Sequence, residues 1–227
     1  MKEGGSKYKI YFESFNLGLG YIISLLVSLL GMRLLTEYMS PESYGELTLF
    51  LTIAALINSI IFGPIAFGVS RFYVISRERK IYAVFEEVIF NLIKKNALFV
   101  SVFLFILSFI SYLYGYISWT YGLLLLIPFS ILSSINTIFF NVQNAARNRG
   151  IAIWHNVIEK ALKFIIAAIF LYILFDYSLL ALLGFTLGVT IIFFSHYFFY
   201  QKVIGGPLSI LSRAVETPEK KKYLVQL

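Results

Sequence analysis

Long uncharged stretches dominate the chain, and they alternate with short segments that hold the charges. Residues 14–32 and 47–70 contain no Asp, Glu, Lys or Arg, and neither do residues 96–146. A transmembrane helix needs about 20 mostly apolar residues. The longest stretch therefore divides in two, at the turn-like, aromatic segment 115–119. The pattern predicts six transmembrane helices, near residues 12–35, 46–70, 96–115, 119–141, 153–175 and 178–200.

Composition supports this interpretation. Hydrophobic residues make up 59% of the 227 residues and charged residues only 14%, whereas soluble domains carry about 25% charged residues. A soluble domain of this length could not bury so much apolar surface, but lipid can cover it. The sequence predicts an all-α, polytopic membrane protein, with one transmembrane lobe over residues 1–204. A basic, poorly ordered tail is expected over residues 205–227.

The basic residues predict the orientation. With the N-terminus inside, all of the 19 Lys and Arg residues except Arg33 fall in the cytoplasmic segments. Cytoplasmic loops are rich in Lys and Arg, so the expected location is the cytoplasmic membrane, with both termini cytoplasmic. The net charge of +7 then faces the anionic lipid of the inner leaflet rather than nucleic acid. The longest internal loop, 71–95, is expected to contain an amphipathic interfacial helix at 85–93.

Catalytic and metal-binding motifs are not found. The chain has no Cys and only two His, in no metal-ligand spacing. It has no GxSxG, Walker or dinucleotide-binding motif. We expect no enzyme activity, no metal and no cofactor.

Polar residues at membrane depth are the informative ones, because an ionisable group there usually faces a cavity or a partner. In the fifth predicted span, His155, Glu159 and Lys163 share one helix face, so Glu159 can pair with Lys163. Asn156 and Lys160 form the adjacent line. This face is either the wall of a charged, water-filled cavity or a segment in the headgroup zone with snorkelling lysines.

Two arginines sit at the ends of predicted spans. Arg33 could contact an anionic substrate or the carboxylate of Glu37, or anchor lipid phosphate at the interface. Arg71 could contact phosphate from the inside, or be an ordinary positive-inside arginine.

The second and fourth predicted spans each contain an amide that could face a cavity. Asn58 precedes Gly63 and Pro64, a pair expected to kink the helix and free backbone carbonyls. Asn136 is the deepest amide near the inner end of the fourth span. Broken helices and buried amides occur at transport sites, but also in plain helix packing.

Small residues recur at helical spacing in two predicted spans. Gly20, Ser24 and Ser28 are followed by Gly31, and Gly184 and Gly188 form a GxxxG motif. Both patterns allow close approach of helices, and we expect them to serve packing inside the lobe rather than a dimer interface.

The segment Arg33-Leu-Leu-Thr-Glu-Tyr-Met-Ser-Pro-Glu-Ser-Tyr-Gly45 resembles the first external loop of polysaccharide flippases of the Wzx type, with its Pro-x-x-Tyr-Gly element. Two other segments are similar to that family, Phe62-Gly-Pro-Ile-Ala-Phe-Gly-Val-Ser-Arg71-Phe-Tyr and Gln143-Asn-Ala-Ala-Arg147-Asn-Arg149. The resemblance covers about residues 10–202. The family is related to the multidrug and toxin extrusion transporters and to the lipid II flippase.

The resemblance implies a fold and an activity. Family members have two six-helix lobes around a cationic cavity, and move a lipid-linked oligosaccharide across the membrane by alternating access. It implies membrane lipid and a lipid-linked sugar diphosphate as partners. Candidates for holding the diphosphate match only in charge and approximate position: Arg33, Arg71, Arg147, Lys160 and Lys163.

This chain departs from the family because it carries one lobe. The chain is then a truncated product, or two copies form a homodimer, or a separate chain supplies the second lobe. The function hypothesis is a flippase half. The alternatives are half of a small-molecule or drug exporter, for which Glu159 is the only near acidic candidate, and a non-transporting membrane scaffold.

Overall fold

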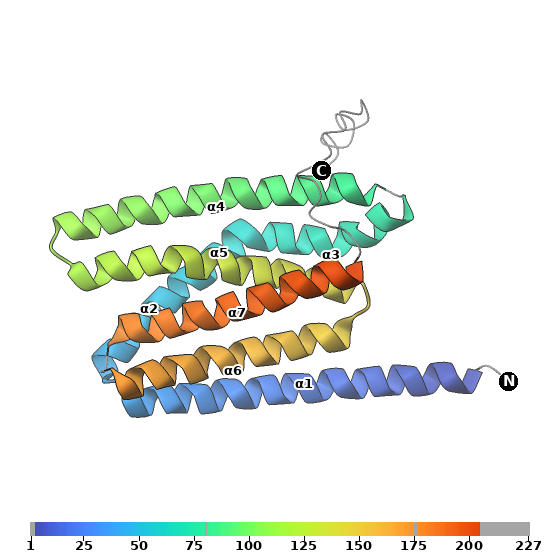
Figure 1. The fold of residues 1–227 in the computed structure, drawn as a ribbon, viewed down its shortest axis with the longest axis horizontal. Coiled ribbons are helices and arrows are strands. Elements are labelled where there is room, and N and C mark those ends of the chain that lie inside the picture. The colour runs from blue at the N-terminus through green and yellow to red at the C-terminus, as the bar shows by residue number, and fades with distance from the viewer. Residues whose placement is uncertain (1–2, 80, 175–176, 205–227) are drawn as a thin grey trace.

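Helices account for nearly all of the residues that the structure describes. The computed structural model describes residues 3–79, 81–174 and 177–204, with side chains placed from residue 14 to residue 200 of these ranges. The elements are α1 (Glu3–Tyr38), α2 (Pro41–Ile57), the π-helical turn η1 (Asn58–Phe62), α3 (Gly63–Glu78), α4 (Tyr82–Leu113), α5 (Ile117–Ala145), α6 (Arg149–Ile173) and α7 (Ser178–Ile204). No strand occurs in these ranges. Because α2, η1 and α3 are continuous, the chain makes six long passes (Figure 1).

Five of the passes in the described ranges are both long and apolar enough to cross a membrane. The sixth, α6, is long enough at 25 residues, but Glu159, Lys160 and Lys163 lie within five positions of each other. The expected all-helical, polytopic architecture is therefore present, with five to six helices suited to a membrane. The predicted tail at 205–227 lies outside the described residues.

The two ends of the bundle differ. The α3–α4 and α5–α6 turns lie at the same end as the start of α1 and the end of α7 (Figure 1). We call this the basic end, because its turns are flanked by Arg77, Arg79, Arg147 and Arg149. The α1–α2, α4–α5 and α6–α7 turns lie at the opposite end.

One boundary prediction is wrong. The segment 85–93 is not a separate interfacial helix but part of α4, which runs without a break from Tyr82 to Leu113. No Gly or Pro interrupts this stretch, so the amphipathic segment simply continues the helix. Most of the predicted loop 71–95 is therefore helical, since α3 ends at Glu78 and α4 begins at Tyr82. The turn expected near Gly115 is present, and this glycine has a φ of 78°, which favours glycine.

Local chemistry explains where α2 begins. Ser40 is its N-cap, and the Ser43 N–H donates to Ser40 Oγ at 3.3 Å. Pro41 follows at the first helical position, where its missing N–H costs nothing.

The predicted kink at Gly63 and Pro64 is present. The helix changes to π-helical geometry over Asn58–Phe62, so that the Gly63 N–H donates to the carbonyl of Asn58, five residues back. Pro64 has no N–H and interrupts the ordinary pattern here. Asn96 Nδ2 of α4 donates a hydrogen bond to the carbonyl of Ile61, a residue of η1, 3.0 Å away. Figure 1 shows the change of direction between α2 and α3.

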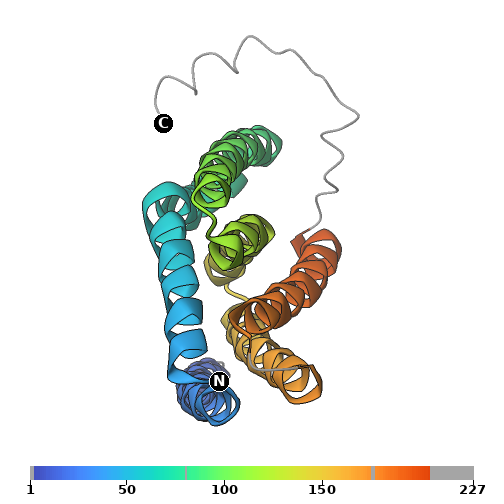
Figure 2. The ribbon, with the colours of Figure 1, turned by 90° about the vertical axis from the view of Figure 1, so that its left-hand side faces the viewer.

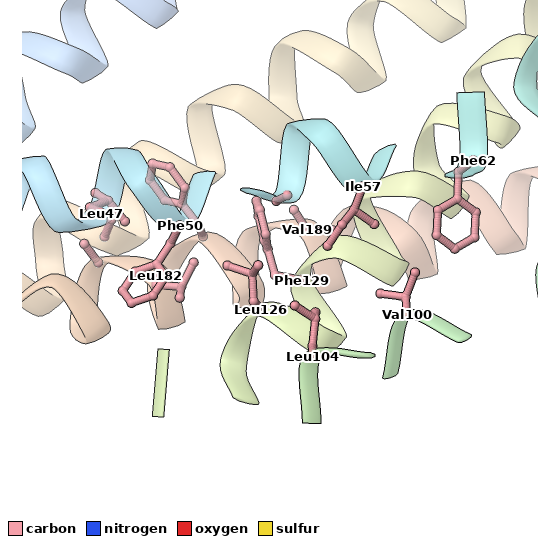
Figure 3. Close-up of a cluster of buried hydrophobic side chains, with 14 of the residues drawn as sticks. Leu47, Phe50, Ile57, Phe62, Val100, Leu104, Leu126, Phe129, Leu182 and Val189 are labelled. Atoms are coloured by element: carbon pink, nitrogen blue, oxygen red, sulfur yellow. The ribbon is translucent and has the colours of Figure 1, made fainter. Parts of the chain in front are cut away.

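The apolar core lies around α5, between α2, α4 and α7 (Figure 3). Phe50 is fully buried, and its ring lies against Gly122, where a Cβ would come within 2.1 Å of it. The ring also packs on Trp119, with centroids 5.0 Å apart. Gly122 therefore makes room for the largest fully buried side chain of α2.

Helix α6 is held between α1 and α7 by small residues on both of them. A Cβ on Gly20 or Gly31 of α1 would collide with Ile153 or Phe164. The glycines of α7 approach backbone instead: a Cβ on Gly184 would lie 2.6 Å from the Ala167 backbone. The small-residue patterns thus serve packing inside the lobe, as expected. Figures 1 and 2 show α1, α6 and α7 side by side.

Substituting Gly184 with Ala should destabilise the protein by about 1–3 kcal/mol, because the Ala167 backbone cannot move aside without separating α6 from α7. Thermal unfolding in detergent, followed by circular dichroism, measures this. Gly18→Ala is the matched control, since no atom lies within 4 Å of its Cβ position. Equal melting temperatures for the two variants would contradict the packing argument.

Candidate functional site

The centre of the candidate site is an ion pair on α6. Lys163 Nζ lies 3.0 Å from Glu159 Oε1, and the two side chains are 19% and 13% exposed. Asn136 of α5 donates from Nδ2 to Glu159 Oε2 at 3.1 Å, and also to the Val189 carbonyl of α7 at 3.1 Å. The pairing predicted from the spacing of residues 159 and 163 is confirmed. It connects α5, α6 and α7.

The neighbouring line of α6 faces the other way, towards α1. Lys160 Nζ donates to Ser24 Oγ at 2.7 Å. Ser24 Oγ lies 3.4 Å from Asn156 Oδ1, in a longer hydrogen bond. Lys160 has no carboxylate partner within hydrogen-bond distance in the described residues. With Glu159 engaged by Lys163, this part of α6 carries one positive charge in excess.

Asn58 approaches the site from the other side of α5. Its Nδ2 lies 3.5 Å from Thr137 Oγ1, a distance at the limit of a hydrogen bond. Thr137 follows Asn136 in sequence, so the two side chains point about 100° apart around α5, and Asn58 contacts a face next to that of Asn136. Gly63 and Pro64 lie just beyond Asn58, at the kink.

The three candidate arginines do not join this group. Arg33, Arg71 and Arg147 are all exposed. Arg71 has its guanidinium 5.6 Å from the ring of Phe72, its neighbour in sequence. Arg147 sits in the α5–α6 turn with a φ of 62°. The structure therefore brings Asn136, Glu159 and Lys163 together, places Lys160 against α1 and leaves these arginines apart.

A carboxylate that the sequence analysis did not single out ties the opposite end of the bundle together. Glu46 of α2 accepts a hydrogen bond from Ser118 Oγ at 2.6 Å and another from Ser178 Oγ. Ser118 and Ser178 lie in the first turns of α5 and α7, where the helix dipole favours a negative charge. Glu46 is the only charged residue between residues 43 and 70 of the sequence. A single carboxylate in an otherwise uncharged predicted span was the feature of the sequence that could have pointed to this contact.

A shallow groove of about 480 Å³ opens beside Glu46, with Glu42, Trp119 and Tyr177 in its lining. Both oxygens of Glu46 already accept hydrogen bonds from serines. The carboxylate therefore serves to join α2, α5 and α7.

A second cluster missed in the sequence lies at the basic end. Tyr200 of α7 donates to Glu86 of α4 and also contacts the hydroxyl of Tyr82. The Arg77 guanidinium lies over the Tyr82 ring, 4.1 Å from its centroid. The cluster joins the first two turns of α4 to the end of α7. The reassignment of residues 85–93 explains the miss, since Glu86 was expected on an interfacial surface.

These contacts define a polytopic helical membrane protein whose helices are linked by polar side chains. No protein-family model, curated protein or solved structure matches the chain.

Replacing Glu159 with Leu should cost about 2 kcal/mol of stability, because Lys163 then keeps a charge without its partner. The double variant Glu159→Leu/Lys163→Leu should recover part of the loss. Thermal unfolding of the two single variants and the double variant forms a cycle that isolates the coupling. If the losses of stability in the two single variants add up to the loss in the double variant, the pair contributes nothing to stability.

Glu46→Ala should destabilise the protein by about 2 kcal/mol, because two hydroxyls lose a charged acceptor. The control is Glu42→Ala, an exposed carboxylate in the first turn of α2, which should cost less than about 1 kcal/mol. Thermal unfolding of both variants checks this; equal losses would contradict a tie through Glu46.

Proposed function

We propose that this protein is one lobe of a membrane transporter that moves a lipid-linked oligosaccharide across the cytoplasmic membrane, both termini facing the cytoplasm. It works together with a second six-helix lobe, which a second copy can supply. The proposal involves no covalent chemistry, because the lipid tail stays in the bilayer while the sugar diphosphate crosses.

The observation that carries the proposal is the charged group on α6. Ionisable side chains within membrane-crossing bundles are rare and usually functional. Here Glu159, Lys160 and Lys163 lie among α1, α5 and α7, with one ammonium in excess. A net positive charge suits the diphosphate of a lipid carrier.

The segmental resemblance to polysaccharide flippases supports the same substrate class. The kinked second pass supports it too, since discontinuous helices are common in transporters. A cationic drug is a poorer fit, because Glu159, the acidic residue expected for such a substrate, is paired with Lys163.

The test is a lipid-flipping assay in proteoliposomes, with a fluorescent undecaprenyl-diphosphate-linked sugar and a membrane-impermeant quencher. Wild-type protein, alone or covalently joined to a second copy, should make the inner-leaflet probe accessible. Lys160→Met should slow this about tenfold, the equivalent of about 1.4 kcal/mol. Lys95→Met is the control, because it is an exposed lysine at the basic end of α4. Equal slowing by both variants would contradict a role for the α6 charges.

A second candidate is a non-transporting membrane scaffold, and a specific observation favours it. Asn136, Lys160 and Lys163 each bond to a neighbouring residue of the bundle, which is what packing alone requires. A scaffold predicts no flipping by the wild-type protein, either alone or covalently joined to a second copy. It also predicts that Lys160→Met lowers the melting temperature.

A further inference from the structure

The only two histidines of the sequence meet between α6 and α7. His155 and His196 are 41 residues apart in the chain, yet their ring centroids lie 4.3 Å from each other, with 42° between the ring planes. His196 is 2% exposed. The pair lies towards the basic end, about 9 Å along α6 from Arg149. The proposed function does not use it.

The hydrogen bonds assign a protonation state to His196. Gln143 Nε2 lies 2.9 Å from His196 Nδ1. In this orientation of the Gln143 amide the nitrogen donates, so Nδ1 accepts and the ring is neutral, with its proton on Nε2. His155 Nε2 lies 3.2 Å from Ser195 Oγ, an exposed side chain. Ser195 therefore places the pair one side chain away from the outer surface of the bundle.

Two buried polar atoms in this cluster have no hydrogen-bond partner: Gln143 Oε1 and His155 Nδ1. Unpartnered buried groups are uncommon and call for an explanation. The Gln143 amide can turn over, placing Oε1 where Nε2 now lies. In that orientation it accepts from His196 Nδ1–H. Gln143 can therefore bind either protonation state of His196.

The surroundings leave a bound proton without a counter-ion. Around the rings, α5 contributes Gln143 and Phe139, and α7 contributes Ser195 and Phe199. Within the described side chains, the one titratable group acting on His196 is His155. Glu159, one turn further along α6, is engaged by Asn136 and Lys163. Two imidazolium rings at this spacing would repel each other strongly.

We propose that His155 and His196 form a site that binds a single proton between them, and that the Gln143 amide turns over when the proton binds. The proton adds to a ring nitrogen; no bond other than its N–H forms. The site makes the contact between α6 and α7 sensitive to proton concentration at the basic end. It does not depend on which substrate, if any, the protein moves.

The test uses the full chain, purified without a histidine tag, in lipid nanodiscs and labelled with ¹⁵N-histidine and ¹⁵N-glutamine. Imidazole ¹⁵N shifts report protonation and tautomer for each ring as the pH is lowered. His155→Gln and His196→Gln assign the two rings. The wild-type pair should take up one proton in total. Each single variant should also take up one proton, at its remaining ring, so the two variants sum to two protons, twice the wild-type number. The Gln143 amide resonances should shift in the same step as the wild-type pair.

Two results would overturn the proposal: independent protonation of both rings in the wild-type protein, or no protonation of either ring while the chain stays folded. Gln143→Leu should move the step, and Asn141→Leu should not. Asn141 is the matched control because its amide, also on α5, donates to the Thr137 carbonyl instead. If a histidine variant fails to fold, the wild-type titration alone still counts the protons.

Discussion

The close approach of α6 to α7 is the constraint on which the polar interior depends. Gly184 and Gly188 let the backbone of α6 come so near that a Cβ at either position would lie under 3 Å from backbone atoms. At that spacing the Asn136 amide can bond to Glu159 and to the Val189 carbonyl together. The same approach brings His155 against His196. Without these glycines, α7 would stand further from α6, and these contacts between the two helices could not form.

Lipid is no worse a solvent for apolar side chains than the protein interior, so apolar burial alone does not hold such helices together. Polar contacts occur at both ends of this bundle as well as in its middle. Glu46 joins α2 to the first turns of α5 and α7, and Tyr200 joins α7 to Glu86 of α4. Each is made by residues distant in sequence. In the second pass, α2 is tied to α5 and α7 through Glu46, whereas α3 contacts α4 through Arg77, whose guanidinium lies over the Tyr82 ring.

The arrangement of charges separates two roles that looked alike in the sequence. The α6 lysines are held by protein groups, Lys163 by Glu159 and Lys160 by Ser24. The exposed arginines at residues 33, 71 and 147 remain at the ends of the passes. Helical spacing decides the first group, since residues 159 and 163 share a face whatever the surroundings. No short-range sequence pattern indicates which groups the three arginines contact.

The sequence by itself determined the long helices, the kink at Gly63 and Pro64, the small-residue contacts and the Glu159–Lys163 pair. These depend on local patterns: uncharged length, backbone chemistry and helical periodicity. Only the tertiary structure decided that Glu46 meets Ser178, that Tyr200 meets Glu86 and that the two histidines touch. Such contacts join residues more than 40 positions apart. They form only where the packing of the helices brings those residues next to each other. The boundary at residues 85–93 was missed for a related reason, because an amphipathic face does not say where its helix begins.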